Sequence, residues 1–270
     1  MEPIFEASAL SVGYTVPILQ DISFSLFPGE MVGVLGRNGC GKTTLLRAIT
    51  GELPCISGEI RLMGENIRRL SVRERARRTA VMPQGSHAVL GITVMEAIAM
   101  GGYAREGFWW GMSPQLRQKV ELCAEDLGIA SILHRDFGLL SQGQQQMVLL
   151  CRLLVQDTPL MLLDEPNAAL DFDNARQLLH IIRQLTDQKE KGALLVLHDP
   201  QLALSYCSRL LIVHRGKIAA DVSAHAPMET LEKALNILYP GLCLTENPLD
   251  TGFFAAFPPR KMYSQGKITP

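Results

Sequence analysis

The chain has 270 residues, 47% of them apolar and 20% charged, which is ordinary for a globular protein and argues against a disordered one. This length can form one large core with an inserted subdomain. Basic and acidic residues nearly balance, leaving a net charge of −1, so no overall field draws the chain to nucleic acid or to an anionic bilayer. Any bound anion must be held by local geometry, and we expect no nucleic-acid partner.

The six cysteines are widely spaced and form no Cys-x-x-Cys pair, so neither a zinc site nor a redox pair is indicated. A secreted disulfide scaffold would be smaller and denser in cysteine. The N-terminus lacks the blocks of a signal peptide, and no apolar run approaches the roughly 20 residues of a membrane-spanning helix. We therefore expect a cytosolic chain that reaches a membrane only through a partner.

The N-terminal part predicts strands on either side of a turn. Within 5–27, Ile22, Phe24 and Leu26 alternate with serines, the period of a half-buried antiparallel strand. The apolar run at 31–35 is typical of a strand buried on both faces. In chain order we expect strands at 5–27 and 31–35, a helix at 42–50 ended by Gly51, and a hairpin at 58–67.

The next stretch carries several helix start signals. Ser71 with Glu74 fits a capping box, in which each residue bonds the backbone N–H of the other. Thr93 with Glu96 fits a second one, and Ser113 stands before a proline at the first helical position. Residues from about 85 to 157 are therefore predicted to be mostly helical.

Strands return at 160–164, 193–198 and 210–214, separated by helices near 173–188 and 200–207. Strand and helix alternation on both sides of a helical block predicts an α/β core interrupted by a helical subdomain. The pattern weakens from about residue 222, and we expect 251–270 to be an irregular tail.

The segment GRNGCGKT at 36–43 matches the phosphate-binding P-loop pattern, after a predicted strand and before a predicted helix. Its glycines let backbone N–H groups turn inward, and the helix N-terminus adds positive potential. Lys42 can reach the β- and γ-phosphates, while the Thr43 hydroxyl can bind Mg²⁺. The alternative is a glycine-rich turn without a ligand. We expect the phosphates to contact Gly36, Arg37, Asn38, Gly39, Cys40, Gly41, Lys42, Thr43 and Thr44.

An acidic pair ends the predicted strand at 160–164. Asp164 is suited to hold Mg²⁺ through water, and Glu165 can orient or deprotonate an attacking water. Such a pair alone is more often a helix N-cap. Together with a P-loop in the same chain, it predicts nucleoside triphosphate hydrolysis.

The segment LSQGQ at 140–144 resembles the signature motif, usually LSGGQ, of ATP-binding cassette (ABC) proteins. Further family elements occur in family order: Tyr14 in LSVGY, Gln84 in VMPQ, Asp171 in AALD and His198 in VLHDP. The resemblance implies a P-loop NTPase (RecA-like) core with an N-terminal antiparallel β subdomain and an inserted helical subdomain. Its expected boundaries are 1–84 and 158–221 for the core, 85–157 for the helical subdomain and 222–270 for a C-terminal tail.

The resemblance also implies a role for each motif residue. Glu165 is the expected catalytic base, and His198 the γ-phosphate sensor; the alternative for His198 is a core histidine. Gln84 would contact Mg²⁺ or water, and Asp171 would couple the two sites of a dimer. Tyr14 would stack on adenine; the alternative is an ordinary strand aromatic.

In this family two cassettes dimerise head to tail around two ATP molecules. Ser141, Gly143 and Gln144 would then begin a helix at 141–157 whose N-terminus faces the γ-phosphate held by the partner's P-loop. Two residues depart from the family pattern: Gln142 replaces a glycine and Met147 a frequent arginine. A positive φ at Gln142 would be strained. The other signature residues remain, which favours a working variant.

Residues 70–84, 93–105 and 197–220 resemble the cassettes that serve ferric-siderophore, haem and vitamin B12 import. This resemblance implies membrane permease subunits as partners, a substrate-binding protein reached through them, and a peripheral position on the cytoplasmic membrane face. The alternatives are a soluble ABC ATPase of DNA repair or ribosomes, and an exporter cassette. Trp109 and Trp110 would either dock the permease or belong to the subdomain core.

Overall fold

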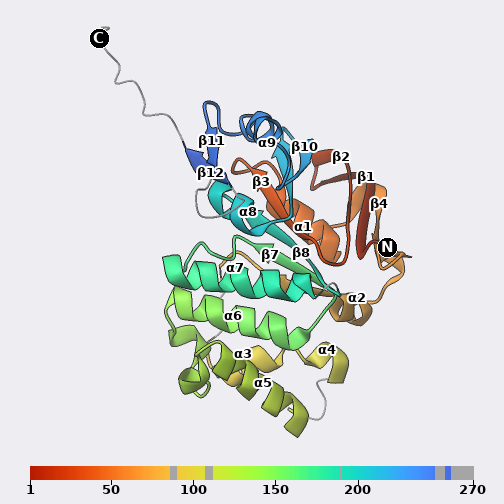
Figure 1. Ribbon diagram of the computed structural model, residues 1–270. Coiled ribbons are helices and arrows are strands. Elements are labelled where there is room, and N and C mark those ends of the chain that lie inside the picture. The colour runs from red at the N-terminus through yellow and green to blue at the C-terminus, as the bar shows by residue number, and fades with distance from the viewer. Residues whose placement is uncertain (86–89, 107–111, 189, 247–252, 257–270) are drawn as a thin grey trace, which may run out of the picture.

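The computed structural model describes residues 1–85, 90–106, 112–188, 190–246 and 253–256 (Figure 1). Two sheets and α1 form one half of the molecule, and α3, α4, α5 and α6 lie together in the other half. The bounds of the helices not given below are α2 Val72–Arg78, α3 Val94–Ala99, α4 Tyr103–Glu106, α5 Pro114–Asp126 and α7 Phe172–Asp187.

A six-stranded sheet forms the centre of the fold, in the order β10-β9-β3-β8-β7-β6. Its inner strands pair in parallel, and β10 is antiparallel to β9. Every residue of β3, β7 and β8 is buried, as expected for apolar strands covered on both faces. The strands are β3 Met31–Gly36, β6 Thr79–Met82, β7 Leu160–Asp164, β8 Gly192–Leu197, β9 Arg209–His214 and β10 Lys217–Ser223.

A second sheet, in the order β2-β1-β4-β5, is antiparallel. It comprises β1 Phe5–Gly13, β2 Pro17–Leu26, β4 Cys55–Leu62 and β5 Glu65–Asn66. Helix α1, Lys42–Thr50, packs into the core that both sheets share, through Leu45, Leu46 and Ile49. The predicted antiparallel β subdomain is therefore confirmed, and it covers the face of the central sheet on which α1 lies.

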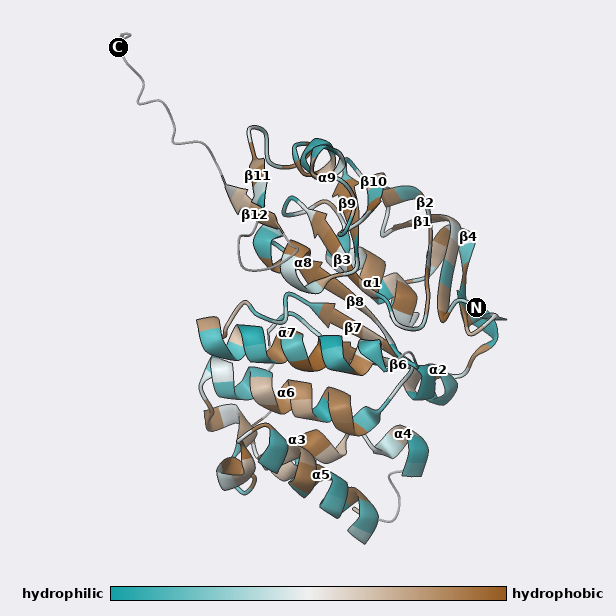
Figure 2. Cartoon of the chain, in the orientation of Figure 1, coloured by the Kyte–Doolittle hydropathy of each residue, from teal (hydrophilic) through white to brown (hydrophobic). Residues whose placement is uncertain are grey.

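The helical part packs around α6, Gln142–Gln156. Side chains of α3, α5, α6 and α7 share one apolar core with the other face of the central sheet. Figure 2 shows both brown and teal residues along α6 and along α7, which lies next to it. The capping boxes predicted at Ser71 and Thr93 and the N-cap at Ser113 are confirmed.

Two strands of the central sheet, β6 and β10, were not expected from the sequence. β6 joins the central sheet beside β7 at residues 79–82, where four residues offer too short a pattern to separate a strand from the preceding helix. It follows directly on α2. The strand matters because Gln84 lies two residues beyond its end.

The expectation of an irregular tail at 251–270 is wrong at β12, and the preceding stretch, where the sequence pattern weakens, also contains regular elements. Helix α9 spans Met228–Leu235, and β11, Cys243–Glu246, pairs with β12, Phe253–Ala256. Leu231 and Leu235, one helical turn apart, are buried in the main core. These elements are short, so their periodicity is weak in sequence. Their tertiary contacts stabilise them.

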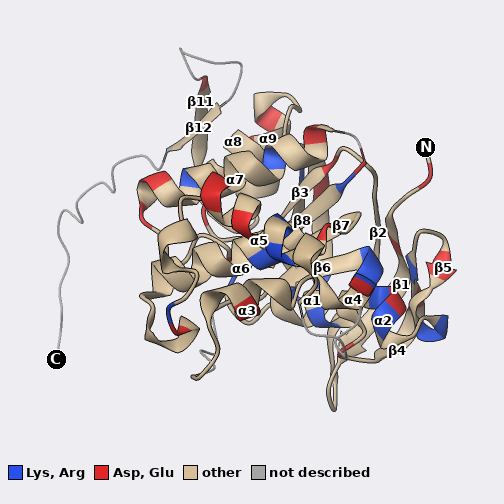
Figure 3. Cartoon of the chain, turned by 90° about the horizontal axis from the view of Figure 1, so that it is seen from below, with Lys and Arg blue, Asp and Glu red and all other residues tan. Residues whose placement is uncertain are grey.

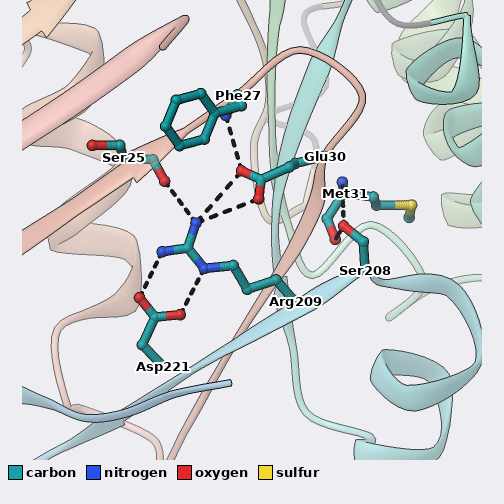
Figure 4. A network of polar contacts seen from close by, with 7 residues as sticks. All are labelled: Ser25, Phe27, Glu30, Met31, Ser208, Arg209 and Asp221. Atoms are coloured by element: carbon teal, nitrogen blue, oxygen red, sulfur yellow. Dashed lines mark hydrogen bonds and ion pairs between the residues drawn. The ribbon is translucent and has the colours of Figure 1, made fainter. Parts of the chain in front are cut away.

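Arg209, the first residue of β9, joins the two sheets (Figure 4). Its Nε and Nη2 atoms each donate a 2.6 Å hydrogen bond to the carboxylate of Asp221 on β10. Its Nη1 atom donates to the carbonyl oxygen of Ser25 on β2 at 3.0 Å and lies 3.5 Å from the Glu30 carboxylate. The contact to Ser25 makes this guanidinium a direct link between the antiparallel subdomain and the core.

The near-zero net charge conceals a local excess of arginine at 68–78, RRLSVRERARR. Figure 3 shows these blue residues on α2, close to α4. Arg73 and Arg77 both donate to the carbonyl oxygen of Ala104, as cations often do at helix C-termini. None of the helices in the described part of the chain combines the length and apolar composition needed to cross a bilayer.

Candidate active site

The glycine-rich loop leads from β3 directly into α1. Gly41 is the N-cap of α1 with φ 104°, and no side chain caps the helix. A Cβ atom at Gly41 would lie 2.8 Å from Leu19 Cγ, so no other residue fits this position without displacement. The first N–H groups of α1 therefore remain available to an anion, at the positive end of the helix.

Lys42 supplies the positive charge of this loop. The side chain is buried, and its Nζ atom donates to the carbonyl oxygens of Gly36 at 2.8 Å and Arg37 at 3.3 Å. A cavity of about 450 Å³ opens beside it. Sequence-predicted residues make up most of its lining: Asn38, Gly39, Gly41, Lys42, Thr43, Thr44, Gln84, Glu165 and His198, with Ile18 added.

Asp164 ends β7 and lines a separate cavity of about 250 Å³, to which Thr43 and Gln84 also contribute. Its side chain is 3% exposed, and its Oδ1 atom has no hydrogen-bond partner within the described residues. Burial raises the pKa of Asp164, and a hydrogen bond with the Thr43 side chain counteracts that rise. An unpaired buried carboxylate oxygen beside a hydroxyl is a donor set that suits Mg²⁺, so these residues fit the expected ion.

Glu165 lies between two polar side chains from the neighbouring strand ends. Gln84 Nε2, after β6, donates a 2.6 Å hydrogen bond to Glu165 Oε2. His198 Nε2, after β8, is hydrogen-bonded to Glu165 Oε1. The Glu165 backbone has φ 50°, a left-handed conformation that costs a non-glycine residue on the order of 1 kcal/mol. This turn aims the carboxylate at both partners.

His198 is not a core histidine, and Tyr14 is not an ordinary strand aromatic. The His198 side chain is 42% exposed, so it is not a core histidine. Tyr14 follows the last residue of β1 and is 61% exposed. Its hydroxyl accepts a 2.9 Å hydrogen bond from Arg47 of α1. Tyr14 is therefore at the edge of the P-loop helix, outside the cavity that Lys42 lines.

The other P-loop side chains separate into exposed and packed positions. Arg37 is exposed. Cys40 packs against the shared core of the two sheets, and a Cβ atom at Gly36 would lie 2.5 Å from its Sγ atom. Burial raises the pKa of the Cys40 thiol, while the nearby Lys42 lowers it in part. The Cys40 side chain therefore fills space beneath the loop.

The signature segment begins α6. Ser141 Oγ accepts from Gln144 N at 3.3 Å, and Gln144 Oε1 accepts from Ser141 N at 3.2 Å, which closes a capping box. Gly143 approaches the next loop closely, since a Cβ atom there would lie 3.3 Å from Ala169 O. Gln142 is the exposed first helical residue and is not among the residues with positive φ. The backbone strain considered for Gln142 is therefore absent.

Two residues of this segment have contacts that the sequence did not reveal. Gln146 is 2% exposed and its Nε2 atom donates a 2.8 Å hydrogen bond to Pro166 O, the residue after Glu165. Met147 is buried in the main core. A glutamine at a buried helix position was the available signal for Gln146, because buried amides need partners.

Asp171 is the N-cap of α7, and its carboxylate accepts both the backbone N–H and the side-chain amide of Asn174, at 2.9 and 3.0 Å. Asp171, Ser141, Gly143 and Gln144 do not line the cavity beside Lys42. Within one chain the predicted site is thus divided into two groups of residues. Trp109 and Trp110 lie outside the described residues.

The arrangement can bind an anion at the P-loop, hold a divalent cation at Thr43 and Asp164, and present a carboxylate beside both. A parallel sheet whose strand ends carry a P-loop and an acidic pair defines a P-loop nucleotide hydrolase. The predicted α/β fold class is confirmed. The particular family follows from comparison with known proteins.

A family model described as ABC transporter matches residues 19–168. The chain is 36% identical over 230 residues to the hemin import ATP-binding protein HmuV of Escherichia coli O157:H7, covering 82% of this chain and 86% of that protein. It is 34% identical over 227 residues to the achromobactin transport ATP-binding protein CbrD of Dickeya dadantii (strain 3937), covering 84% and 83%. The chain therefore belongs to the ABC transporter family and is an ATP-binding ATPase of that family.

Solved structures have the same fold. The ATP-binding subunit of an ABC transporter superposes with a TM-score of 0.77 at 25% identity, covering 87% of this chain and 98% of that one. A dimeric ATP-binding cassette in a post-hydrolysis state, bound to ADP and Pi, has a TM-score of 0.74 at 20% identity, covering 82% and 98%. At that identity the second likeness bears on the fold alone.

Proposed function

We propose that this chain is the ATP-hydrolysing subunit of a membrane importer for a metal chelate of the ferric-siderophore, haem or cobalamin type. Relatives named for hemin import and achromobactin transport support the substrate class. The observation that carries the hydrolytic role is the position of Glu165, hydrogen-bonded to both Gln84 and His198 beside the Lys42 cavity. ATP is the substrate of this site.

The first part of the reaction is binding of the triphosphate. Backbone N–H groups from Gly36 to Thr44 surround the β- and γ-phosphates, and Lys42 exchanges its contacts with the loop carbonyls for phosphate oxygens. Thr43 and Asp164 would hold Mg²⁺, with Gln84 close by. When bound, Mg²⁺ would neutralise part of the negative charge of the phosphates. Tyr14, held by Arg47, would stack on the adenine at the edge of α1.

The second part is attack of water on the γ-phosphorus, which forms inorganic phosphate as the bond from that phosphorus to the β–γ bridging oxygen breaks and ADP leaves. Glu165 Oε1 and Oε2 are hydrogen-bond acceptors for a water held between the carboxylate and the phosphate, and Glu165 takes its proton. His198 and Gln84 hold the carboxylate by its two oxygens. Once ATP is bound, the exposed His198 ring would contact the γ-phosphate. The position of the His198 backbone would determine whether the ring reaches that phosphate.

The predicted site residues of α6 and α7 do not line the cavity beside Lys42, and this separation supports a dimer in which they act on the partner's ATP. We propose that two chains associate head to tail, so that Ser141, Gly143 and Gln144 at the N-terminus of α6 face the γ-phosphate on the partner's P-loop. Asp171 would couple the two sites. A C₂ arrangement with complementary surfaces completes both sites at once. Closure on ATP and reopening after hydrolysis would drive the permease between conformations.

The remaining partners follow from the family. We propose that integral-membrane permease subunits hold the dimer at the cytoplasmic face of the membrane as a peripheral component, and that a substrate-binding protein delivers the chelate to them. We also propose the domain boundaries 1–84 with 158–221 for the core and 85–157 for the helical subdomain.

The decisive experiment is uptake by cells that contain the chain with its membrane subunits. Hemin, a ferric siderophore and cobalamin are supplied in separate arms, with the parent chain and with Lys42→Ala. We expect ATP-dependent uptake in one arm, and its loss in Lys42→Ala together with the ATPase activity. Equal uptake by the parent and Lys42→Ala in every arm would exclude the importer role.

A further inference from the structure

The C-terminal segment contacts the turn that carries His198. Tyr239 lies four residues after α9, and its hydroxyl donates a 2.8 Å hydrogen bond to the backbone carbonyl oxygen of His198. The Tyr239 ring is half-buried and packs against the main core. Burial and the charge of nearby Asp199 raise the pKa of Tyr239, so the hydroxyl keeps its proton and remains a donor.

The backbone at His198 determines where its ring lies. Only His198 and Asp199 separate the end of β8 from the start of α8, Pro200–Tyr206. Asp199 caps α8, since its Oδ1 atom accepts from Gln201 N at 2.8 Å. The exposed ring touches Glu165 through Nε2. A shift of this short turn would therefore move the ring away from Glu165.

A second contact joins the same turn to the C-terminal hairpin. Gln201, in the first turn of α8, donates from Nε2 to Phe253 O at 3.2 Å and accepts from Ala255 N at 2.8 Å through Oε1. One side-chain amide thus pairs with the backbone of β12 as a neighbouring strand would. The hairpin is held against α8, directly after the His198 turn.

The part of the segment that presents Tyr239 is itself well fixed. Asn236 donates from Nδ2 to Leu242 O at 2.8 Å and accepts from Gly241 N at 2.7 Å. Glu232 Oε1 accepts from Leu244 N at 2.6 Å. These bonds close the turn between α9 and β11 around Tyr239. The hydroxyl therefore meets the His198 carbonyl from a rigid support.

We propose that Tyr239 is a positioning residue of the ATPase reaction. It holds the main chain of His198, and through it the imidazole, against Glu165 and toward the γ-phosphate. This inference rests on the role proposed above for His198. It assigns the C-terminal segment a function within the catalytic cycle, although none of the residues described in that segment lines the cavity beside Lys42.

The test is ATP hydrolysis by the full chain carrying Tyr239→Phe, which removes one hydroxyl and keeps the ring. We expect kcat to fall about fivefold, the effect of one ordinary hydrogen bond. The KM for ATP should match the parent because the P-loop is untouched, and the thermal midpoint should fall by only about 2–4 °C, the effect of one lost hydrogen bond. Tyr206→Phe, on half-buried Tyr206 of α8, is the matched control and should keep the parent kcat.

A double-mutant comparison separates positioning from a general structural effect. In a His198→Ala background, assayed with radiolabelled ATP, Tyr239→Phe should cause no further loss, since the ring to be positioned is gone. A parent-like kcat in Tyr239→Phe, or an equal fivefold loss in the His198→Ala background, would overturn the inference while leaving the ATPase proposal intact. If His198→Ala alone keeps the parent rate, the proposed role of His198 fails first.

Discussion

Gln84 Nε2 donates a 2.6 Å hydrogen bond to Glu165 Oε2, and these two residues, 81 positions apart in the chain, follow the ends of neighbouring strands. Because Gln84 is the first polar residue after β6, this bond connects the Glu165 carboxylate to the chain that follows that strand. We propose that a change in the arrangement of the helices reaches Glu165 through this side chain.

Glu165→Gln is expected to keep ATP binding and to abolish turnover. An amide has the shape of the carboxylate but cannot take the proton of the attacking water, so we expect hydrolysis to fall by at least about 10²-fold. The ATP-bound dimer should then accumulate and be resolved by size-exclusion chromatography with ATP. Glu229→Gln on the exposed face of α9 is the control and should behave as the parent. Hydrolysis at the parent rate would remove Glu165 from the role of base.

Mixing two inactive variants tests the head-to-tail dimer. Lys42→Ala removes the P-loop charge and Ser141→Arg blocks the start of α6, so each homodimer should be inactive. In a mixed dimer, one site has both defects and the other has neither. With random pairing and independent sites of C₂ symmetry, an equal mixture should recover about a quarter of the parent ATPase rate. A mixture as inactive as its components would mean that Lys42 and Ser141 act within one chain.

Asp164→Asn is expected to weaken Mg²⁺ dependence specifically. The Asp164 Oδ1 atom is buried without a partner among the described residues, and replacing the carboxylate by an amide removes the charge that favours the cation. Titration of ATPase activity with Mg²⁺ should show a midpoint at least about tenfold higher, within the range for altered metal-site residues. Binding of ATP without the metal, followed by a fluorescent analogue, should be unchanged. An unaltered Mg²⁺ midpoint would exclude Asp164 from the metal site.

Alkylation of Cys40 by a bulky maleimide is expected to block ATP binding. The thiol lies beneath the loop, and the adduct would displace the loop. Burial raises the pKa of Cys40, so the thiolate fraction, and with it the alkylation rate, should rise as the pH increases from 7 to 9. Cys40→Ser should make binding insensitive to the reagent, whereas Cys243→Ser at an exposed position should not. Persistent sensitivity of Cys40→Ser would assign the effect to another cysteine.

Arg209→Ala is expected to destabilise the fold by about 2 kcal/mol, since hydrogen bonds to charged groups contribute about 1.5–3 kcal/mol and this guanidinium is partly solvated. The loss removes the link from β9 to Ser25 and leaves Asp221 without its partner. Urea unfolding followed by circular dichroism measures the change. Arg61→Ala, in an exposed pair with Glu59, serves as the control, and its effect should be much smaller because exposed ion pairs contribute little. Equal effects of the two substitutions would contradict a linking role for Arg209.

Short contiguous patterns in the sequence determined the helix caps, the helix ends and the P-loop of this protein. The capping boxes at Ser71 and Thr93, the helix that Gly51 ends and the P-loop between β3 and α1 each depend on residues within a few positions of one another. Their physical causes are local: side chains that satisfy the free N–H groups of a helix, and glycines that adopt a positive φ. These features can therefore be predicted from the sequence without knowledge of the rest of the fold.

Tertiary structure decided which distant residues meet. The bonds of Glu165 to Gln84 and His198, of Gln146 to Pro166 and of Tyr239 to His198 join segments 20 to 81 residues apart. None of them is encoded by spacing, because strand order and helix packing place these atoms. The same holds for β6 and for the C-terminal hairpin, which are too short to be stable alone and form only against the core. Sequence alone therefore determined the parts of the P-loop site, and packing determined how the Glu165 carboxylate is held.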